Sequence, residues 1–195
     1  QANLRIFFAI ASWTLFFFIP AITMRMLAEE TKTGTLELLL TKSVSDRQLV
    51  TGKFIASLLL ICIALVATLP YIITIANIGN LDNGGTICGY LALFLMSMVY
   101  TSIGIFTSSI TSNQIVAFMG ALMIGLFFHI IFDVLAGNFT GFIGNLFDLL
   151  SLQTHFESIS RGVIDSQDLV YFISVSILSL FLAEWSLSNR HFQKK

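Results

Sequence analysis

The stretch from Asn83 to Phe132 reads NGGTICGYLALFLMSMVYTSIGIFTSSITSNQIVAFMGALMIGLFFHIIF, 50 residues without an Asp, Glu, Lys or Arg. A helix that crosses a bilayer needs about 20 mostly apolar residues. The run is therefore too long for one crossing and about right for two. A polar patch from Ser108 to Gln114 divides it. The sequence predicts two spans here, over residues 86–107 and 115–136.

The composition of the whole chain indicates the same class. Of 195 residues, 56% are hydrophobic and 11% charged, with a mean hydropathy of +0.88, whereas soluble proteins are about 45–50% apolar and about 25% charged. A soluble core of this size cannot bury so much apolar side chain, and a disordered chain is excluded by the same numbers. Ten Lys and Arg against eleven Asp and Glu leave no basic field for a nucleic-acid partner.

Three further apolar runs complete the count of spans. We expect an all-α polytopic bundle, a single transmembrane domain over residues 1–195, with Ser45 and Gln48 forming a capping box before the second span. The runs do not alternate as β-barrel strands would. The five expected spans are 5–24, 48–76, 86–107, 115–136 and 169–187, separated by a cytoplasmic segment 25–47 and an outer segment 137–168.

The distribution of basic residues predicts the orientation. Segment 25–47 with Lys53, together with the C-terminal tail, carries eight of the ten Lys and Arg, and only Arg5 and Arg161 fall on the other side. The positive-inside rule then places the N-terminus outside and the C-terminus in the cytoplasm. Because the chain begins with Gln1 and enters apolar sequence at once, we expect it to be the later part of a longer protein, with one span before it.

The cytoplasmic segment contains MRMLAEETKTGTLELLLTKS, Met24 to Ser43, which is too apolar for a solvated loop. Gly34 is expected to adopt a positive φ and change the chain direction. Thr35 can then cap a short amphipathic helix with Glu37 in its first turn, and its apolar stripe is Leu36, Leu39 and Leu40. Such a helix either binds a partner or lies passively on lipid headgroups.

This segment resembles the signature of type-2 ABC exporter permeases. That signature has an arginine, an acidic pair, Gly-Thr-Leu-Glu, a leucine run and a Gly-Lys in the next helix. The matching residues here are Arg25, Glu29-Glu30, Gly34 to Glu37, Leu38 to Leu40, and Gly52-Lys53. The chain is similar in particular to the gliding-motility-associated permeases of bacteria, and the stretch from Phe156 to Asp165 before the last span points the same way. Many members of this family have a proline at the position of Ser43, so the chain differs from the signature there.

The resemblance implies a permease domain in the bacterial inner membrane, with six spans in the full-length subunit. It also implies separate ABC ATPase subunits that dock on the cytoplasmic segment and a second permease subunit, identical or different, that completes the pathway in the lipid. The coupling and docking residues are then Glu29, Glu30, Gly34, Thr35, Leu36, Glu37, Leu39 and Leu40.

No catalytic motif accompanies these features. A P-loop needs Gly-x-x-x-x-Gly-Lys-Ser/Thr, and Gly52-Lys53 is followed by Phe54 with Arg47 in place of the first Gly. No His-Glu-x-x-His or Gly-x-Ser-x-Gly motif is present. We therefore expect no enzyme activity, cofactor or metal in this chain, and any ATP hydrolysis on a partner.

Two sets of residues within the spans are further candidates. His129 and Asp133 stand at i and i+4 and form a candidate intramembrane polar site, although Asp133 can also simply reach interfacial water. Ala117, Ala121 and Gly125 recur every four residues and are expected to allow close helix packing.

The outer segment is expected to contain one amphipathic helix, with an apolar stripe of Leu152, Phe156, Ile159 and Val163. Such a helix caps the pathway, binds an extracytoplasmic partner, or packs on its own bundle.

The function predicted from the sequence is thus the membrane subunit of an ATP-driven exporter. The alternative is a membrane scaffold of a motility or secretion machine that transports nothing itself. A secondary transporter is disfavoured because paired intramembrane ion sites and inverted halves are not found.

Overall fold

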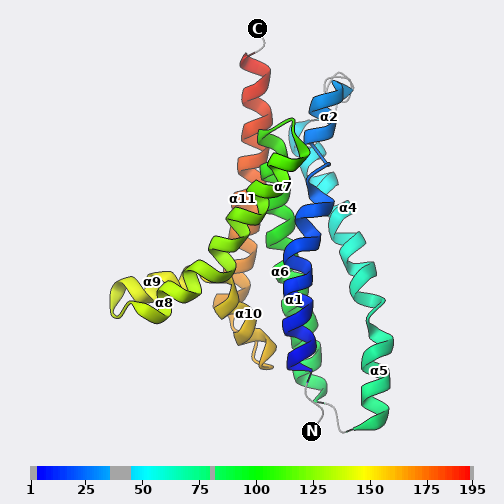
Figure 1. Cartoon of the computed structure of the whole chain (residues 1–195), viewed down its shortest axis with the longest axis vertical. Coiled ribbons are helices and arrows are strands. Elements are labelled where there is room, and N and C mark those ends of the chain that lie inside the picture. Colours follow the sequence, from blue (N-terminus) through cyan, green and yellow to red (C-terminus); the bar gives the residue numbers. More distant parts are fainter. Residues whose placement is uncertain (1–3, 36–44, 80–81, 194–195) are drawn as a thin grey trace.

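The computed structural model describes residues 4–35, 45–79 and 82–193, and these form helices and no strand (Figure 1). The helices in chain order are α1 (Arg5–Thr23), α2 (Ala28–Thr33), α4 (Asp46–Val66), α5 (Leu69–Ile78), α6 (Asn83–Ile110), α7 (Gln114–Leu126), the π-helical turn η1 (Phe127–Ile131), α8 (Phe132–Asn138), α9 (Phe142–Leu150), α10 (Leu152–Ser160) and α11 (Ser166–Gln193).

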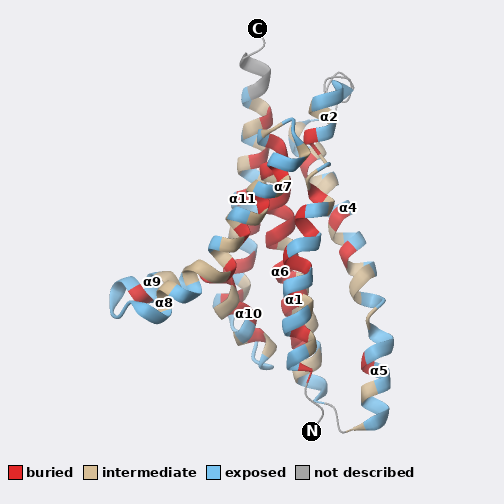
Figure 2. Ribbon diagram, in the orientation of Figure 1, coloured by how far each residue is buried: buried red, intermediate tan, exposed pale blue. Residues whose placement is uncertain are grey.

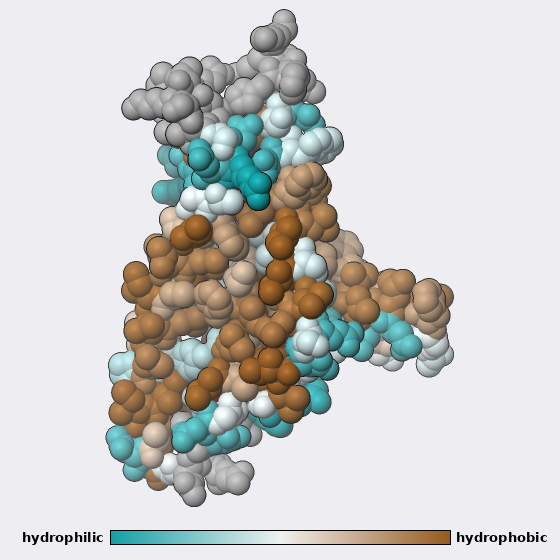
Figure 3. Space-filling model, turned by 180° about the vertical axis from the view of Figure 1, so that it is seen from behind, coloured by the Kyte–Doolittle hydropathy of each residue, from teal (hydrophilic) through white to brown (hydrophobic). Residues whose placement is uncertain are grey.

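Five helical stretches are long and apolar enough to cross a membrane, which confirms the predicted polytopic all-α bundle. They are Arg5–Thr33, Asp46–Ile78, Asn83–Ile110, Gln114–Asn138 and Ser166–Asn189. One face of the molecule shows an apolar band between two hydrophilic ends (Figure 3). We call the end that holds α2 and the C-terminus the elbow end, and the end that holds the N-terminus the opposite end (Figure 1).

Helix α6 is the centre of the bundle. Most of its residues are buried (Figure 2), and α1, α4, α7, α10 and α11 pack against it. Two of its glycines allow α1 to come close: Gly89 faces the ring of Phe8, Gly104 faces Thr23, and neither site has room for a Cβ. Close backbone approach of this kind stabilises helix pairs in lipid, where hydrophobicity gives no net attraction.

Polar side chains fix the starts of three helices. The predicted capping box is confirmed: Gln48 N donates to Ser45 Oγ over 3.3 Å, and Ser45 N donates to Gln48 Oε1 over 3.2 Å. Asp82 caps α6 and Asn113 caps α7. The polar patch that divides the uncharged run includes the end of α6, the turn at residues 111–113 and the first residue of α7.

The second candidate span is broken, where the sequence analysis expected one helix over 48–76. Helix α4 ends at Val66 and α5 begins at Leu69. Pro70 has no backbone N–H to offer the preceding turn. The hydroxyl of Thr68 donates to Leu65 O over 2.6 Å and lies 2.6 Å from Tyr90 Oη, so polar groups at the break are satisfied.

The segment before α11 differs from the single amphipathic helix that we expected. It contains two helices, α9 and α10, and α8 and α9 form a hairpin that projects from the bundle (Figure 1). Leu152, Phe156 and Ile159 of α10 are buried in the core of the chain itself, which is the arrangement of a helix packed on its own bundle. The predicted stripe is wrong at Val163, which is 65% exposed, because α10 ends at Ser160 and Gly162 adopts φ 94°.

The Gly104 contact gives a first testable prediction. Gly104→Ala places a Cβ against Thr23 Oγ1, so α1 and α6 must separate, and we expect a loss of about 1–3 kcal/mol in the free energy of unfolding. The control is Gly52→Ala in α4, where nothing lies within 4 Å of an added Cβ and alanine should favour the helix slightly. Thermal unfolding in detergent measures both, and equal melting temperatures would contradict the close approach.

Candidate functional site

The turn from Met24 to Leu27, between α1 and α2, is the first part of the cytoplasmic segment expected from the sequence; we call it the elbow. Its backbone is held by one side chain of the central helix. Ser108 Oγ accepts hydrogen bonds from Leu27 N and Ala28 N, each 3.0 Å long, and donates to Met24 O over 3.1 Å. A single hydroxyl thereby satisfies three backbone groups that no helix supplies with a partner.

Lys53 of α4 holds the elbow from a second side. Its ammonium group donates to Met26 O and to Glu30 Oε1, both over 2.5 Å. The Lys53 and Glu30 side chains are 18% and 26% exposed, so the ion pair is mostly shielded from water and is screened less than a surface pair. The lysine that belongs to the Gly-Lys pair of the sequence pattern thus connects α4, the elbow and α2.

Apolar packing completes the attachment of the elbow. Leu27 and Ala28 are fully buried. Leu27 belongs to a cluster at the elbow end to which α4, α6 and α11 each contribute, through Val50, Ile105, Ala183 and Leu187. The elbow is therefore joined to α4 and α6 by hydrogen bonds and side-chain packing, and to α11 by side-chain packing.

The two acidic residues of α2 have different surroundings. Glu29 is exposed, whereas Glu30 is half-buried and paired with Lys53. From the sequence, both were assigned to docking of a partner. The structure engages the Glu30 carboxylate within the chain, so a positioning role fits Glu30 better, and Glu29 is the acid of this pair that a partner can reach.

Helix α2 ends at Gly34, whose φ of 73° agrees with the expected positive value. Thr35 Oγ1 lies 2.9 Å from Thr33 Oγ1 and donates weakly to Glu30 O over 3.5 Å. The remaining predicted coupling residues, Leu36, Glu37, Leu39 and Leu40, lie outside the described residues, and so does most of the amphipathic helix expected after Thr35.

The contacts of the elbow connect helices, so we call the elbow a joint between α2, α4 and α6. Its groups are backbone amides and carbonyls, the hydroxyls of Ser108 and Ser57, the Met26 thioether, one ion pair and aliphatic side chains. In the described part of the chain, no group of three His, Cys, Asp or Glu residues has the arrangement of a metal site. A displacement of α2 would pull directly on α4 and α6.

Comparison with known families identifies the class of protein to which this joint belongs. A family model described as ABC-2 family transporter protein matches residues 3–186, nearly the whole chain. The chain belongs to the ABC-2 transporter family. A search of curated proteins finds no significant match.

Membership in the ABC-2 family establishes the general role of the chain. It is a multi-pass membrane protein and a permease component of an ABC transporter, and this family works with ABC ATPase partners. The permease itself is a transport component and not the catalytic subunit.

The structure gives His129 and Asp133 different surroundings. His129 is 3% exposed, and its Nδ1 lies 2.9 Å from Tyr100 Oη, with the ring stacked on Phe16 and edge-on to Trp13. Asp133 is exposed. In the π-helical turn η1, Phe132 N donates to Phe127 O; His129 within this turn is buried, whereas Asp133 just after it is not. The aromatic partners of His129 come from other helices and have no signal in the local sequence.

Ala117, Ala121 and Gly125 are all buried in α7. Gly125 faces the rings of Phe16 and Tyr100 within this same chain. These small residues therefore pack α7 against α1 and α6.

A buried pair at the base of α11 was missed by the sequence analysis. His155 Nδ1 lies 2.6 Å from Asp168 Oδ1, and His155 Nε2 lies 3.1 Å from Leu149 O. Since a carboxylate and a carbonyl only accept hydrogen bonds, a ring with a proton on each nitrogen satisfies both. The ring also stacks on Tyr171 with a centroid distance of 4.1 Å, so the pair fastens α10 to α11.

Removing this carboxylate should loosen the junction of α10 and α11. We expect Asp168→Asn to lower the free energy of unfolding by about 1–3 kcal/mol, because a buried hydrogen-bonded pair loses its carboxylate acceptor. The control is Asp165→Asn, an exposed site where the carboxylate accepts from Gln167 N over 3.2 Å and asparagine caps equally well. Chemical unfolding in detergent compares the two, and similar values for both variants would show that the pair contributes nothing.

Proposed function

We propose that this chain is the permease subunit of an ATP-driven exporter and that the elbow transmits the movement of a docked ABC ATPase to the spans. The observation that supports this role is the attachment of the elbow by Ser108 and Lys53. A force on α2 reaches α6 through the first side chain and α4 through the second. A loop whose polar groups bonded only to water would move without displacing α4 or α6.

The docking surface is proposed to include the exposed Glu29 and the segment that follows Gly34. Glu37 adds a second carboxylate, while Leu36, Leu39 and Leu40 provide the apolar stripe that a protein partner can cover. Exposed acidic groups suit basic residues on an ATPase and contribute to its orientation more than to its affinity.

The remaining parts of the proposal concern the setting of the complex. The elbow end is taken as cytoplasmic because it holds Arg25, Lys32 and Lys53, in line with the positive-inside rule. In that orientation the N-terminus lies outside and the C-terminus inside the bacterial inner membrane. A second permease subunit completes the pathway, and the pattern of the cytoplasmic segment favours a role in gliding motility.

If Glu29 belongs to the docking surface, reversing its charge should weaken binding of the ATPase. Glu29→Lys should weaken retention of the ATPase by about tenfold, since a like charge then faces the basic surface of the partner. Asp165→Lys is the control, because Asp165 is an exposed acidic residue just before α11, far from the elbow, and this variant should retain the ATPase normally. Copurification of the full-length complex over a salt series measures this, and equal retention by both variants would remove Glu29 from the docking surface.

The transmission part of the proposal predicts movement at the far end of the bundle. With Cys62 and Cys88 replaced by serine, Val163→Cys supplies a thiol at an exposed site. Addition of ATP with vanadate to the reconstituted complex should change the rate at which the thiol introduced by Val163→Cys is labelled. We expect Ser108→Ala to reduce that change at least fivefold while the ATPase stays bound, because the elbow loses its hold on α6.

Ser109→Ala is the matched control for this measurement. Ser109 is as buried as Ser108 and is its neighbour in α6, but its hydroxyl donates to Phe106 O of the same helix and not to the elbow. It should leave the nucleotide response intact. A response that survives in both variants would contradict transmission through the elbow. If ATP with vanadate does not change the labelling rate in the parent complex, the alternative function, a membrane scaffold that transports nothing itself, is favoured.

A further inference from the structure

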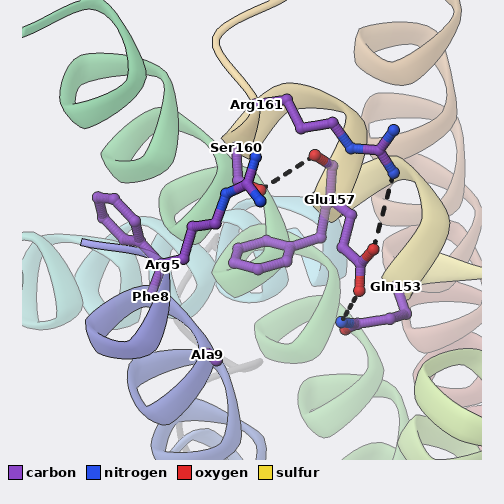
Figure 4. A pocket seen from close by; sticks show the side chains of 8 residues that line it. Arg5, Phe8, Ala9, Gln153, Glu157, Ser160 and Arg161 are labelled. Atoms are coloured by element: carbon purple, nitrogen blue, oxygen red, sulfur yellow. Dashed lines mark hydrogen bonds and ion pairs between the residues drawn. The ribbon is translucent and has the colours of Figure 1, made fainter. Parts of the chain in front are cut away.

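The opposite end of the bundle contains a polar pocket between α1 and α10. It has a volume of about 260 Å³, and charged lining residues come from both sides: Arg5 from α1, and Glu157 and Arg161 from α10 and its C-terminal cap (Figure 4). Arg5 is the first residue of a candidate span. The pocket therefore lies at the depth where a bilayer changes from acyl chains to headgroups.

Two arginines and one glutamate stand beside the pocket. The side chain of Arg5 reaches toward Ser160, and that of Arg161 extends toward Glu157 (Figure 4). The Arg161–Glu157 contact is 3.8 Å long between side chains that are 65% and 53% exposed, so water screens it and the pair is weak. Two guanidinium groups beside one pocket suit a phosphate, which accepts several charge-assisted hydrogen bonds.

The pocket also contains an acceptor without a donor. Gln153 donates through Nε2 to Glu157 Oε1 over 2.9 Å, but its own Oε1 is buried and has no hydrogen-bond partner. A buried acceptor of this kind is costly unless a ligand or water satisfies it. An ammonium group placed between Gln153 Oε1 and the Glu157 carboxylate would satisfy the amide oxygen and balance the carboxylate.

An open apolar surface of α1 continues from the pocket, and we call it the groove. Ala9 lines both the pocket and this shallow hollow of about 370 Å³, whose other lining residues are Ile10, Trp13, Thr14 and Phe17 of the same helix. From Ala9 to Phe17 the helix rises about 12 Å, a distance comparable with most of an acyl chain. Trp13 and Phe17 are 44% and 53% exposed, so their rings are available to a lipid tail.

We propose that this pocket and groove form a binding site for a phospholipid with a phosphoethanolamine headgroup. The phosphate lies between Arg5 and Arg161, the ammonium faces Glu157 and Gln153, and an acyl chain follows α1 past Trp13. A bound lipid would bridge α1 and α10, which both pack on α6, and would stabilise this end of the bundle.

Native mass spectrometry of the delipidated full chain, with added dioleoyl phosphatidylethanolamine, phosphatidylglycerol or phosphatidylcholine, tests the assignment. We expect phosphatidylethanolamine to bind about fivefold to tenfold more tightly than phosphatidylcholine, which has no N–H donor. Arg5→Gln and Arg161→Gln should each weaken the binding of phosphatidylethanolamine by a similar factor. Arg161 is an exposed residue at a helix end, so its variant should fold normally, and its melting temperature without lipid verifies this.

Arg25→Gln is the matched control, since Arg25 is exposed beyond the other end of α1, and it should bind phosphatidylethanolamine like the parent chain. Equal affinity for the three lipids, or tighter binding of phosphatidylglycerol, would overturn the headgroup assignment. Saturation by soluble phosphoethanolamine at the same concentration as the lipid would show that the ligand is a free headgroup compound and overturn the lipid. Binding that is unchanged in Arg5→Gln and Arg161→Gln would overturn the site.

Discussion

The three hydrogen bonds of the Ser108 hydroxyl fix the path of the chain at the elbow end. A chain that leaves one helix and starts another near a bilayer exposes backbone N–H and C=O groups, and water is scarce there to satisfy them. Ser108 supplies both an acceptor and a donor to this turn. The position of α2 is therefore tied to α6, because moving one without the other would break bonds to buried backbone groups.

The fixed position of the elbow also explains why the neighbouring residues Glu29 and Glu30 differ in their contacts. Lys53 reaches the same turn from α4 and engages Glu30, so the acidic residue nearest the bundle serves the joint. Glu29, one position earlier, points away from these contacts and is exposed. Two adjacent glutamates thus have different surroundings because a helix turns its side chains by about 100° per residue.

The sequence predicts features that depend on local properties. Apolar runs and their lengths identified five spans, the capping box at Ser45 was confirmed, and Gly34 has the expected positive φ. The Ser108 contact joins residues 81 positions apart, and the His155–Asp168 pair depends on how α10 folds back on α11. Neither has a periodic signal. The different burial of His129 and Asp133 likewise depends on packing against other helices, which their i,i+4 spacing in the sequence does not show.

The arrangement of helices gives the two ends of the molecule a common dependence on α6. The elbow is bonded to α6 near its C-terminal end, and α10 packs on α6 and is fastened to α11 by His155 and Asp168. Close-packed helices move as bodies because their side chains leave little room for independent adjustment. Under the proposed function, a displacement of the elbow would therefore move α6 together with the helices that pack on it.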